Sequence, residues 1–338
     1  MADFDPREQP RHPDTGMSTG TSLADRPWKG PTYYGREQLK PPPFNKVLVG
    51  TYIFLSGLSG ATAVISAIVN RRHGLDTRAT VRHGRLLSLL APSIGAGLLI
   101  ADLHTPKRFY NMLRVAKATS PMSIGSWILV AFSALAGMTA MAEVSDKRAG
   151  RLAWLRRAAR ISEVPAAAVG VGLSTYTAAL LSATSNPLWA AAPRALAARF
   201  GSSAMASGAA ALSLMEWRPR TRRRLDALAV AALSAELAAT LCSHQAYRHR
   251  GVDGALDGGW GQLETFGTTG LGVALPLVLY ALSPGEPRHR LSSIASWATL
   301  LGSAALRIGV LGQGARAAAR PDVSFRFSQP SNLQTGNL

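Results

Sequence analysis

Residues 121–142 read PMSIGSWILVAFSALAGMTAMA, a stretch without a single charged side chain. A helix needs about 20 apolar residues to cross the hydrocarbon layer of a membrane, so this stretch alone predicts a transmembrane helix. Residues 47–69 and 164–192 are equally free of charge. The chain is therefore expected to be an integral membrane protein, although only 47% of its 338 residues are hydrophobic.

Working outward from this stretch, eight apolar segments follow one another along the chain. They predict an all-α, polytopic membrane protein with about eight transmembrane helices, arranged as two four-helix bundles. The fifth segment is short and the seventh contains Pro276, which membrane helices tolerate. A short interfacial helix is expected at residues 188–199. The eight segments lie near residues 46–70, 86–103, 121–142, 162–186, 199–215, 226–247, 265–282 and 291–312.

Polar sequence flanks this transmembrane domain, which is expected to occupy residues 45–313. Residues 1–44 are rich in proline and glycine and predict a polar N-terminal tail. They lack the apolar core of a cleavable export signal. Residues 314–338 are expected to form a polar C-terminal tail.

The formal net charge of +18 comes from Lys and Arg side chains that flank the apolar segments. No helix combines a basic face with interleaved aromatic side chains, so a nucleic-acid partner is not expected. The loops after helices one, three, five and seven hold 18 Lys and Arg residues, and the loops after helices two, four and six hold 8. Basic loops stay in the cytoplasm. A multi-pass protein of the bacterial cytoplasmic membrane with both termini outside the cytoplasm is therefore predicted.

Histidine and cysteine content limits the redox centres that this chain could hold. Of its seven histidines only His244 falls within an apolar segment, whereas a membrane haem b needs paired histidine ligands. Cys242 is the one cysteine, so an iron–sulfur cluster held by cysteines of this chain is excluded. Neither haem nor an iron–sulfur cluster is expected here, and electrons would have to arrive from another subunit.

Ionisable side chains at membrane depth are costly and therefore mark candidate functional sites. Glu236 and Arg307 lie well inside apolar segments, and an ion pair between the two is the structural alternative. Glu163, for which a solvated position at the headgroups is the alternative, opens the fourth segment. Asp102 closes the second segment, and His244 lies near the end of the sixth.

The most patterned stretch is residues 102–127, DLHTPKRFYNMLRVAKATSPMSIGSW. Together with YTAALLSATSNPLW at 176–189 and the weaker YYGR at 33–36 and YIFLSGLSG at 52–60, it resembles the membrane subunits of the polysulfide reductase, or NrfD-like, family. The resemblance covers roughly residues 32–190. His104 stands where the family usually has glycine, and Leu48 where a polar or acidic residue is expected at the mouth of helix one.

This resemblance implies a membrane anchor that binds a quinone, menaquinone or ubiquinone, near the outer membrane surface beneath an iron–sulfur subunit. That partner would exchange electrons with a catalytic subunit, often a molybdopterin enzyme, so the chain alone would not be catalytic. Quinone reduction consumes two protons, which a buried carboxylate and hydrogen-bond donors can supply. The residues expected to act are Asp102, Tyr176 and His244 in the chemistry; Tyr52, Ser126, Tyr176 and Asp102 in quinone binding; Glu236, Arg307 and Glu163 in proton relay; and Arg108, Asn111 and Arg114 in partner docking.

Two other classes of function fit the same topology. In a secondary transporter, intramembrane Asp, Glu and Arg would line a substrate path. A purely structural anchor would keep the helices but bind no quinone. Arg108 has its own structural alternative, in which it caps the carbonyls that end helix two. The patterned loop at 104–120 favours the quinone-binding subunit, because a simple connector would not need that pattern.

Overall fold

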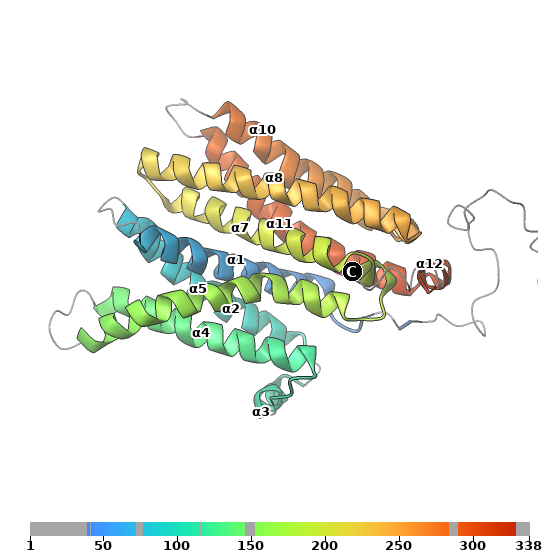
Figure 1. Cartoon of the computed structure of the whole chain (residues 1–338), viewed down its shortest axis with the longest axis horizontal. Helices are drawn as coiled ribbons and strands as arrows, with labels where there is room; N and C mark the ends of the chain where they lie inside the picture. Colours follow the sequence, from blue (N-terminus) through green and yellow to red (C-terminus); the bar gives the residue numbers. More distant parts are fainter. Residues whose placement is uncertain are drawn as a thin grey trace, which may run out of the picture.

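The computed structural model describes residues 39–40, 42–71, 77–103, 105–114, 116–145, 153–283 and 290–328. Within these ranges every regular element is a helix, and the long helices lie side by side (Figure 1). The all-α fold predicted from the apolar segments is confirmed. Most of the expected N-terminal tail and all of the last ten residues, 329–338, lie outside the described residues.

The long helices form two bundles of four. The first bundle consists of α1 (Lys46–Arg71), α2 (Arg78–Ala101), α4 (Pro121–Ser145) and α5 (Ala153–Ser182). The second consists of α7 (Pro193–Met215), α8 (Pro219–His249), the continuous run of α9 (Gly259–Gln262), η6 (Leu263–Ala274) and α10 (Leu275–Leu282), and α11 (Arg290–Ala318). Helix α1 packs on α7 and α11, and α5 packs on α7, which joins the bundles into one body.

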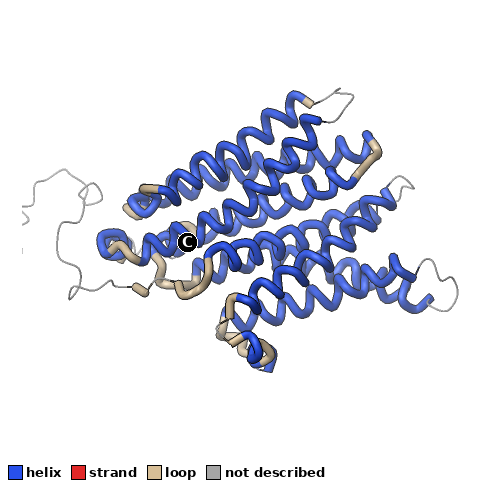
Figure 2. The backbone as a smooth tube through the Cα atoms, turned by 180° about the vertical axis from the view of Figure 1, so that it is seen from behind, coloured by secondary structure: helices blue, strands red, loops and turns tan. Residues whose placement is uncertain are grey.

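Seven of these helices are long and apolar enough to cross a membrane. Helix α7 is not among them, although its 23 residues run alongside the others (Figures 1 and 2). It lies inside the protein, where it packs against α1, α5, α8 and α11, and most of its residues are buried. A helix surrounded by protein does not need a lipid-compatible surface, so alanine, serine and glycine can replace large apolar side chains. This explains why the fifth apolar segment was weak.

The helices extend beyond the apolar segments that predicted them. Helix α2 begins at Arg78 rather than near 86, and α5 begins at Ala153 rather than near 162. Backbone hydrogen bonding continues past the hydrocarbon layer, while the apolar pattern ends with it. Helix α11 runs to Ala318, and α12 (Pro321–Phe327) buries Val323, so the described part of the expected C-terminal tail is helical.

The prediction of one interfacial helix at residues 188–199 is wrong. A five-residue helix, α6 (Pro187–Ala191), begins at Asn186, whose side chain accepts hydrogen bonds from the amides of Leu188 and Trp189. Pro193 then starts α7, at the first helical position where proline is favoured. Arg199 consequently lies inside α7 and is buried, so it does not belong to the loop in which the sequence had counted it.

The two ends of the body differ in what they carry. One end, here called the α12 end, holds the start of α1 and the short helices η4 (Pro106–Arg108), α3 (Asn111–Arg114), α6, η5 (Asp253–Leu256) and α12 (Figure 1). The opposite end holds the 216–218 turn, the last residues of α1, α4 and α10, and the first turns of α2, α5, α8 and α11. Most of the Lys and Arg residues of the larger sum lie in these ends of helices. Both ends of the described chain lie at the α12 end.

Close helix contacts in the first bundle depend on glycine. A β-carbon at Gly60 of α1 would fall against the backbone carbonyl of Gly170 on α5, whereas one at Gly97 of α2 would meet nothing within 4 Å. Gly60→Ala is therefore expected to lower the free energy of unfolding by about 1–3 kcal/mol, the usual cost of overpacking. Gly97→Ala is the matched control and should unfold at the wild-type temperature or slightly above it. Equal thermal midpoints for the two purified variants would show that the bundle adapts at Gly60.

Candidate functional site

Two tyrosines lie together in the first bundle, near the α12 end. Tyr52 of α1 is buried and packs against α2, where a β-carbon on Gly95 would lie 3.3 Å from its ring. Tyr176 of α5 is half-buried and packs against α4, where a β-carbon on Gly125 would overlap its ring and hydroxyl. Tyr52 also packs in one apolar cluster with Ala178, which follows Tyr176 by two residues on α5. Sequence reasoning expected both at the quinone site, and the fold brings them together as a tyrosine pair.

Asp102 lies at the C-terminal end of α2, directly after the helix that carries Gly95. Its Oδ1 accepts a hydrogen bond of 3.0 Å from the backbone amide of Asn45. The side chain of Asn45 in turn accepts from the amides of Val47 and Leu48 and caps α1. Asp102 therefore ties the end of α2 to the start of the helix that carries Tyr52. It is half-buried, so its carboxylate is not sealed from the α12 end.

The remaining expected quinone ligand, Ser126, follows Gly125 on α4. Its hydroxyl donates to the carbonyl of Met122 in its own helix, at 3.1 Å. Ser126 is the residue after Gly125, which packs against Tyr176, so it lies close to the tyrosine pair. Its own described hydrogen bond is local to α4.

The three expected docking residues lie on a short, exposed part of the α2–α4 connection. Arg108 ends η4, while Asn111 and Arg114 bound α3, and all three are exposed. Phe109 and Tyr110 are also exposed, at 42% and 53%, and stack edge-to-face on each other. Figure 1 shows α3 projecting away from the bundle. Exposed aromatic side chains combined with arginine are typical of interface residues.

A second cluster, here called the charge network, is buried in the second bundle and consists of Arg199, Glu236, Glu264 and Arg307, each at most 2% exposed. Arg199 of α7 and Glu264 of η6 form an ion pair. Gln313 of α11 also donates to Glu264, at 3.4 Å. Buried charges of this kind persist only where they are paired and hydrogen-bonded.

Arg307 is held mainly by oxygen atoms of α7 and of its own helix. Nη1 donates to the hydroxyl of Ser203 at 2.7 Å and to the hydroxyl of Ser303 at 2.6 Å, and Nη2 donates to the carbonyl of Phe200 at 3.0 Å. Glu236 of α8 interacts electrostatically with both Arg307 and Arg199. The pairing of Glu236 with Arg307 anticipated from sequence is thus part of a larger set with two positive and two negative charges.

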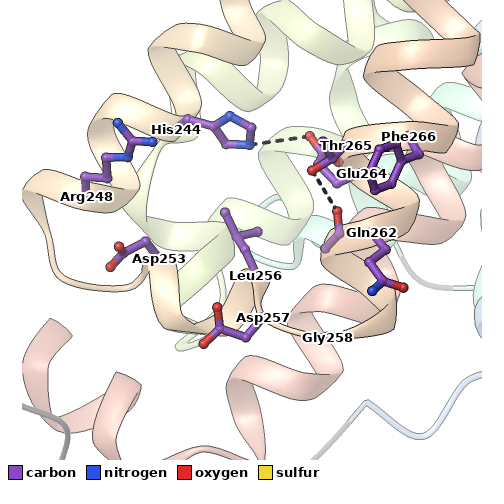
Figure 3. A pocket seen from close by; sticks show the side chains of 11 residues that line it. His244, Arg248, Asp253, Leu256, Asp257, Gly258, Gln262, Glu264, Thr265 and Phe266 are labelled. Carbon is purple, nitrogen blue, oxygen red and sulfur yellow. Dashed lines mark hydrogen bonds and ion pairs between the residues drawn. The ribbon is translucent and has the colours of Figure 1, made fainter.

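A cavity of about 410 Å³ opens beside this network at the α12 end of the second bundle (Figure 3). His244 of α8 points toward Glu264, with Nε2 3.8 Å from Oε1. Asp253 and Asp257 lie toward the other side of the cavity, with Asp257 71% exposed. The buried Arg199–Glu264 pair can therefore be reached from the α12 end through His244. The described contacts of His244 are with Glu264 and Tyr247 of the second bundle and not with the tyrosine pair.

Glu163 lies in a different polar cluster, in the first bundle. It accepts a hydrogen bond from Asn70 at 2.8 Å and pairs with Arg85 at 3.4 Å, and Arg85 also pairs with Glu143 at 2.5 Å. Asn70 lies in the last turn of α1, so this cluster lies toward the opposite end. Its contacts join α1, α2, α4 and α5, and none of those described links Glu163 to Glu236 or Arg307.

Sequence reasoning missed Arg199 and Glu264. Arg199 was placed in the interfacial helix, and Glu264 was left just outside the seventh apolar segment. A signal was present for Arg199, because Ser203 and Ser207 follow it at intervals of four and give α7 a polar face. Glu264 lies in a π-helical segment, a rare geometry that often marks functional sites and that apolar periodicity does not reveal.

Comparison with known proteins gives one match. A family model described as polysulphide reductase NrfD matches residues 37–318. The match extends through the second bundle, beyond the residues that carry the sequence resemblance, and it includes the tyrosine pair, the charge network and the cavity. No curated protein matches the chain.

Proposed function

Because the chain belongs to the polysulphide reductase NrfD family, we propose that it exchanges electrons between an iron–sulfur partner and the membrane quinone pool. Members of this family are membrane subunits of polysulfide- and molybdopterin-type reductase complexes. The observation that supports the proposal is the tyrosine pair, which lies at the same end of the body as the exposed residues 105–114. A menaquinone or ubiquinone bound at the pair would then lie beneath a partner docked on that segment.

The residues of the tyrosine pair suit a quinone headgroup. Quinone carbonyls accept hydrogen bonds, and a phenol hydroxyl is a donor. Tyr176 is the better donor because it is half-buried, whereas Tyr52 is 7% exposed and supports the ring packing on α2. Asp102, half-buried at the end of α2, is suited to exchange protons with the α12 end. Ser126, next to Gly125 on α4, is assigned to contact the headgroup.

Docking is assigned to the segment that contains Arg108, Asn111 and Arg114. An iron–sulfur subunit bound there would cover the exposed rings of Phe109 and Tyr110. Its cluster would then lie close to a quinone bound at the tyrosine pair. That subunit would pass electrons to or from a catalytic subunit, in keeping with the family. The α12 end would face away from the cytoplasm of a bacterial membrane, since the more basic loops lie at the opposite end.

Tyr176→Phe tests the quinone site directly. The substitution removes one hydroxyl and keeps the ring, so quinone affinity is expected to fall by about 1 kcal/mol, roughly fivefold. The measurement is the apparent affinity of the purified complex for a soluble quinone analogue. Thr175→Val is the control, because Thr175 gives its hydroxyl to the carbonyl of Val171 in its own helix, at 3.1 Å. Equal affinities of wild type and Tyr176→Phe would contradict the assignment of Tyr176.

A further inference from the structure

The cavity at the α12 end of the second bundle lies at the depth of the lipid headgroups. His244, which lines it, follows the exposed Arg224 by 20 residues on the continuous helix α8. At a rise of about 1.5 Å per residue this separation is about 30 Å, the thickness of the hydrocarbon layer. Arg224 lies at the opposite end of the body, so His244 lies at the other boundary of the hydrocarbon. Arg248 and Asp253 follow beyond it, in the headgroup layer.

The edges of this cavity toward the membrane are apolar. Phe266 lines the cavity and is 68% exposed. It begins a row of exposed apolar side chains along η6 and α10, which continues with Leu271 and Val278. On the other edge Leu241, one turn before His244 on α8, is 62% exposed. The cavity therefore adjoins the lipid-contacting surface of two helices, which favours a lipid over a soluble molecule as its ligand.

Fixed charges of both signs line the cavity. Arg248, in the last turn of α8, is exposed and follows His244 by one turn, on the same face of the helix. Asp253 and Asp257 supply two negative charges. Figure 3 shows these aspartates on the side of the cavity away from the His244 ring. A ligand that fits this arrangement carries a negative group beside Arg248 and a positive group beside the aspartates.

Only part of this charge is neutralised within the protein. Glu264, also in the cavity lining, is paired with Arg199 and adds no free charge. Oδ2 of Asp257 lies 3.5 Å from Nη1 of Arg320. Arg248 and Asp253 form no ion pair with any residue that the structure describes. One group of each sign is thus left for a ligand, and a zwitterion matches both.

We propose that this cavity binds a zwitterionic phospholipid whose headgroup carries a primary ammonium, as in phosphatidylethanolamine. Its phosphate accepts hydrogen bonds from Arg248, a geometry that suits guanidinium. Its ammonium donates to Asp253 and Asp257, and an acyl chain lies against Phe266. The cavity volume of about 410 Å³ falls within the usual range of ligand pockets.

Other common headgroups fit this cavity less well. Choline has a quaternary nitrogen without an N–H, so it cannot donate to a carboxylate. An anionic headgroup has no positive group to place beside Asp253 and Asp257. The proposed lipid site requires neither a quinone nor a partner subunit and therefore goes beyond the proposed function.

Native mass spectrometry of the purified, delipidated full chain in detergent tests the proposal. The chain is titrated with phosphatidylethanolamine or with phosphatidylcholine of the same acyl chains. Wild type is expected to bind one phosphatidylethanolamine roughly tenfold more tightly, the scale of one charge-assisted hydrogen bond. Asp253→Asn should bring the two affinities together, because it removes the partner of the ammonium. Arg248→Gln should weaken both lipids, since both carry a phosphate.

Arg194→Gln is the matched control. Arg194 is an exposed arginine in the first turn of α7, at the same end of the body, but it does not line the cavity. This variant should bind both lipids like wild type. The proposal is overturned if wild type binds the two lipids equally, or if Asp253→Asn keeps the full preference. Equal weakening in Arg194→Gln and Arg248→Gln overturns it as well.

Glycerophosphoethanolamine, the same headgroup without acyl chains, separates a lipid site from a site for a soluble molecule. It is added as a competitor to the chain loaded with phosphatidylethanolamine. Little displacement is expected at equal concentration, because the free headgroup lacks the contacts along η6. Displacement as effective as that by the lipid itself would overturn the assignment to a lipid. None of these outcomes bears on the quinone site, which the Tyr176 variant tests separately.

Discussion

Quinone-linked electron transfer is expected to fall by roughly 100-fold when Asp102 is replaced by asparagine, while the complex still assembles. Asparagine retains a side-chain carbonyl that can accept the hydrogen bond from the amide of Asn45, so the junction between α2 and α1 is preserved. The change removes only the titratable group. Turnover with a soluble quinol analogue and turnover with an artificial dye that bypasses the quinone should be measured on the same purified complex.

Only the quinol rate should drop, because the dye does not draw on protons from Asp102. Asp322→Asn is the control at the same end of the body, since Asp322, in the first turn of α12, forms an ion pair of 2.8 Å with Arg320. Full quinol activity of an assembled Asp102→Asn complex would exclude Asp102 from proton transfer. A complex that falls apart would show instead that Asp102 serves to join the two helices.

Glu264→Ala is expected to destabilise the second bundle by about 3–5 kcal/mol, because it leaves the guanidinium of Arg199 buried without its carboxylate. The measurement is the denaturant dependence of tryptophan fluorescence in detergent micelles. Trp260, one turn from Glu264, gives a signal from the same bundle.

The double variant Arg199→Met/Glu264→Met shows how much of the stability lost in Glu264→Ala comes from lost packing and how much from the unpaired charge of Arg199. It removes both charges and fills their volume with apolar side chains, so it should recover most of the lost stability. If the two substitutions together cost the sum of their separate effects, the ion pair is not what holds these residues. Glu216→Gln, at a buried carboxylate that hydrogen-bonds Thr80 at the opposite end, provides a control for removing a buried charge elsewhere.

The sequence predicted the fold class because a lipid-facing helix must be free of charged side chains across the hydrocarbon layer. Long stretches without charge, such as residues 121–142, can meet this requirement only as membrane-spanning helices. The ends of the helices could not be predicted in the same way. Arg78 and Arg157 are helical although they are charged, since the headgroup region solvates them while the backbone hydrogen bonds continue.

The tyrosine pair was accessible to sequence reasoning because Tyr52 and Tyr176 belong to the stretches that resemble the family. The charge network was only half predicted. Glu236 and Arg307 interrupt apolar segments and therefore stand out, but Arg199 and Glu264 lie near segment ends, where charges are ordinary. Their burial depends on where Pro193 starts α7 and on the π-helical geometry of η6, which are properties of the assembled bundle.

The small, polar surface of α7 bears on how the chain is made. Helices α1 and α5, two of the walls that cover α7, are synthesised before it, whereas α8 and α11 come after it. Helix α7 is long enough for a membrane span but not apolar enough, and only a three-residue turn separates it from α8, against which it packs extensively. We therefore expect the translocon to insert α7 and α8 together as a helical hairpin against the finished first bundle. Ribosome-bound chains that end before α8 should leave α7 accessible from the aqueous side.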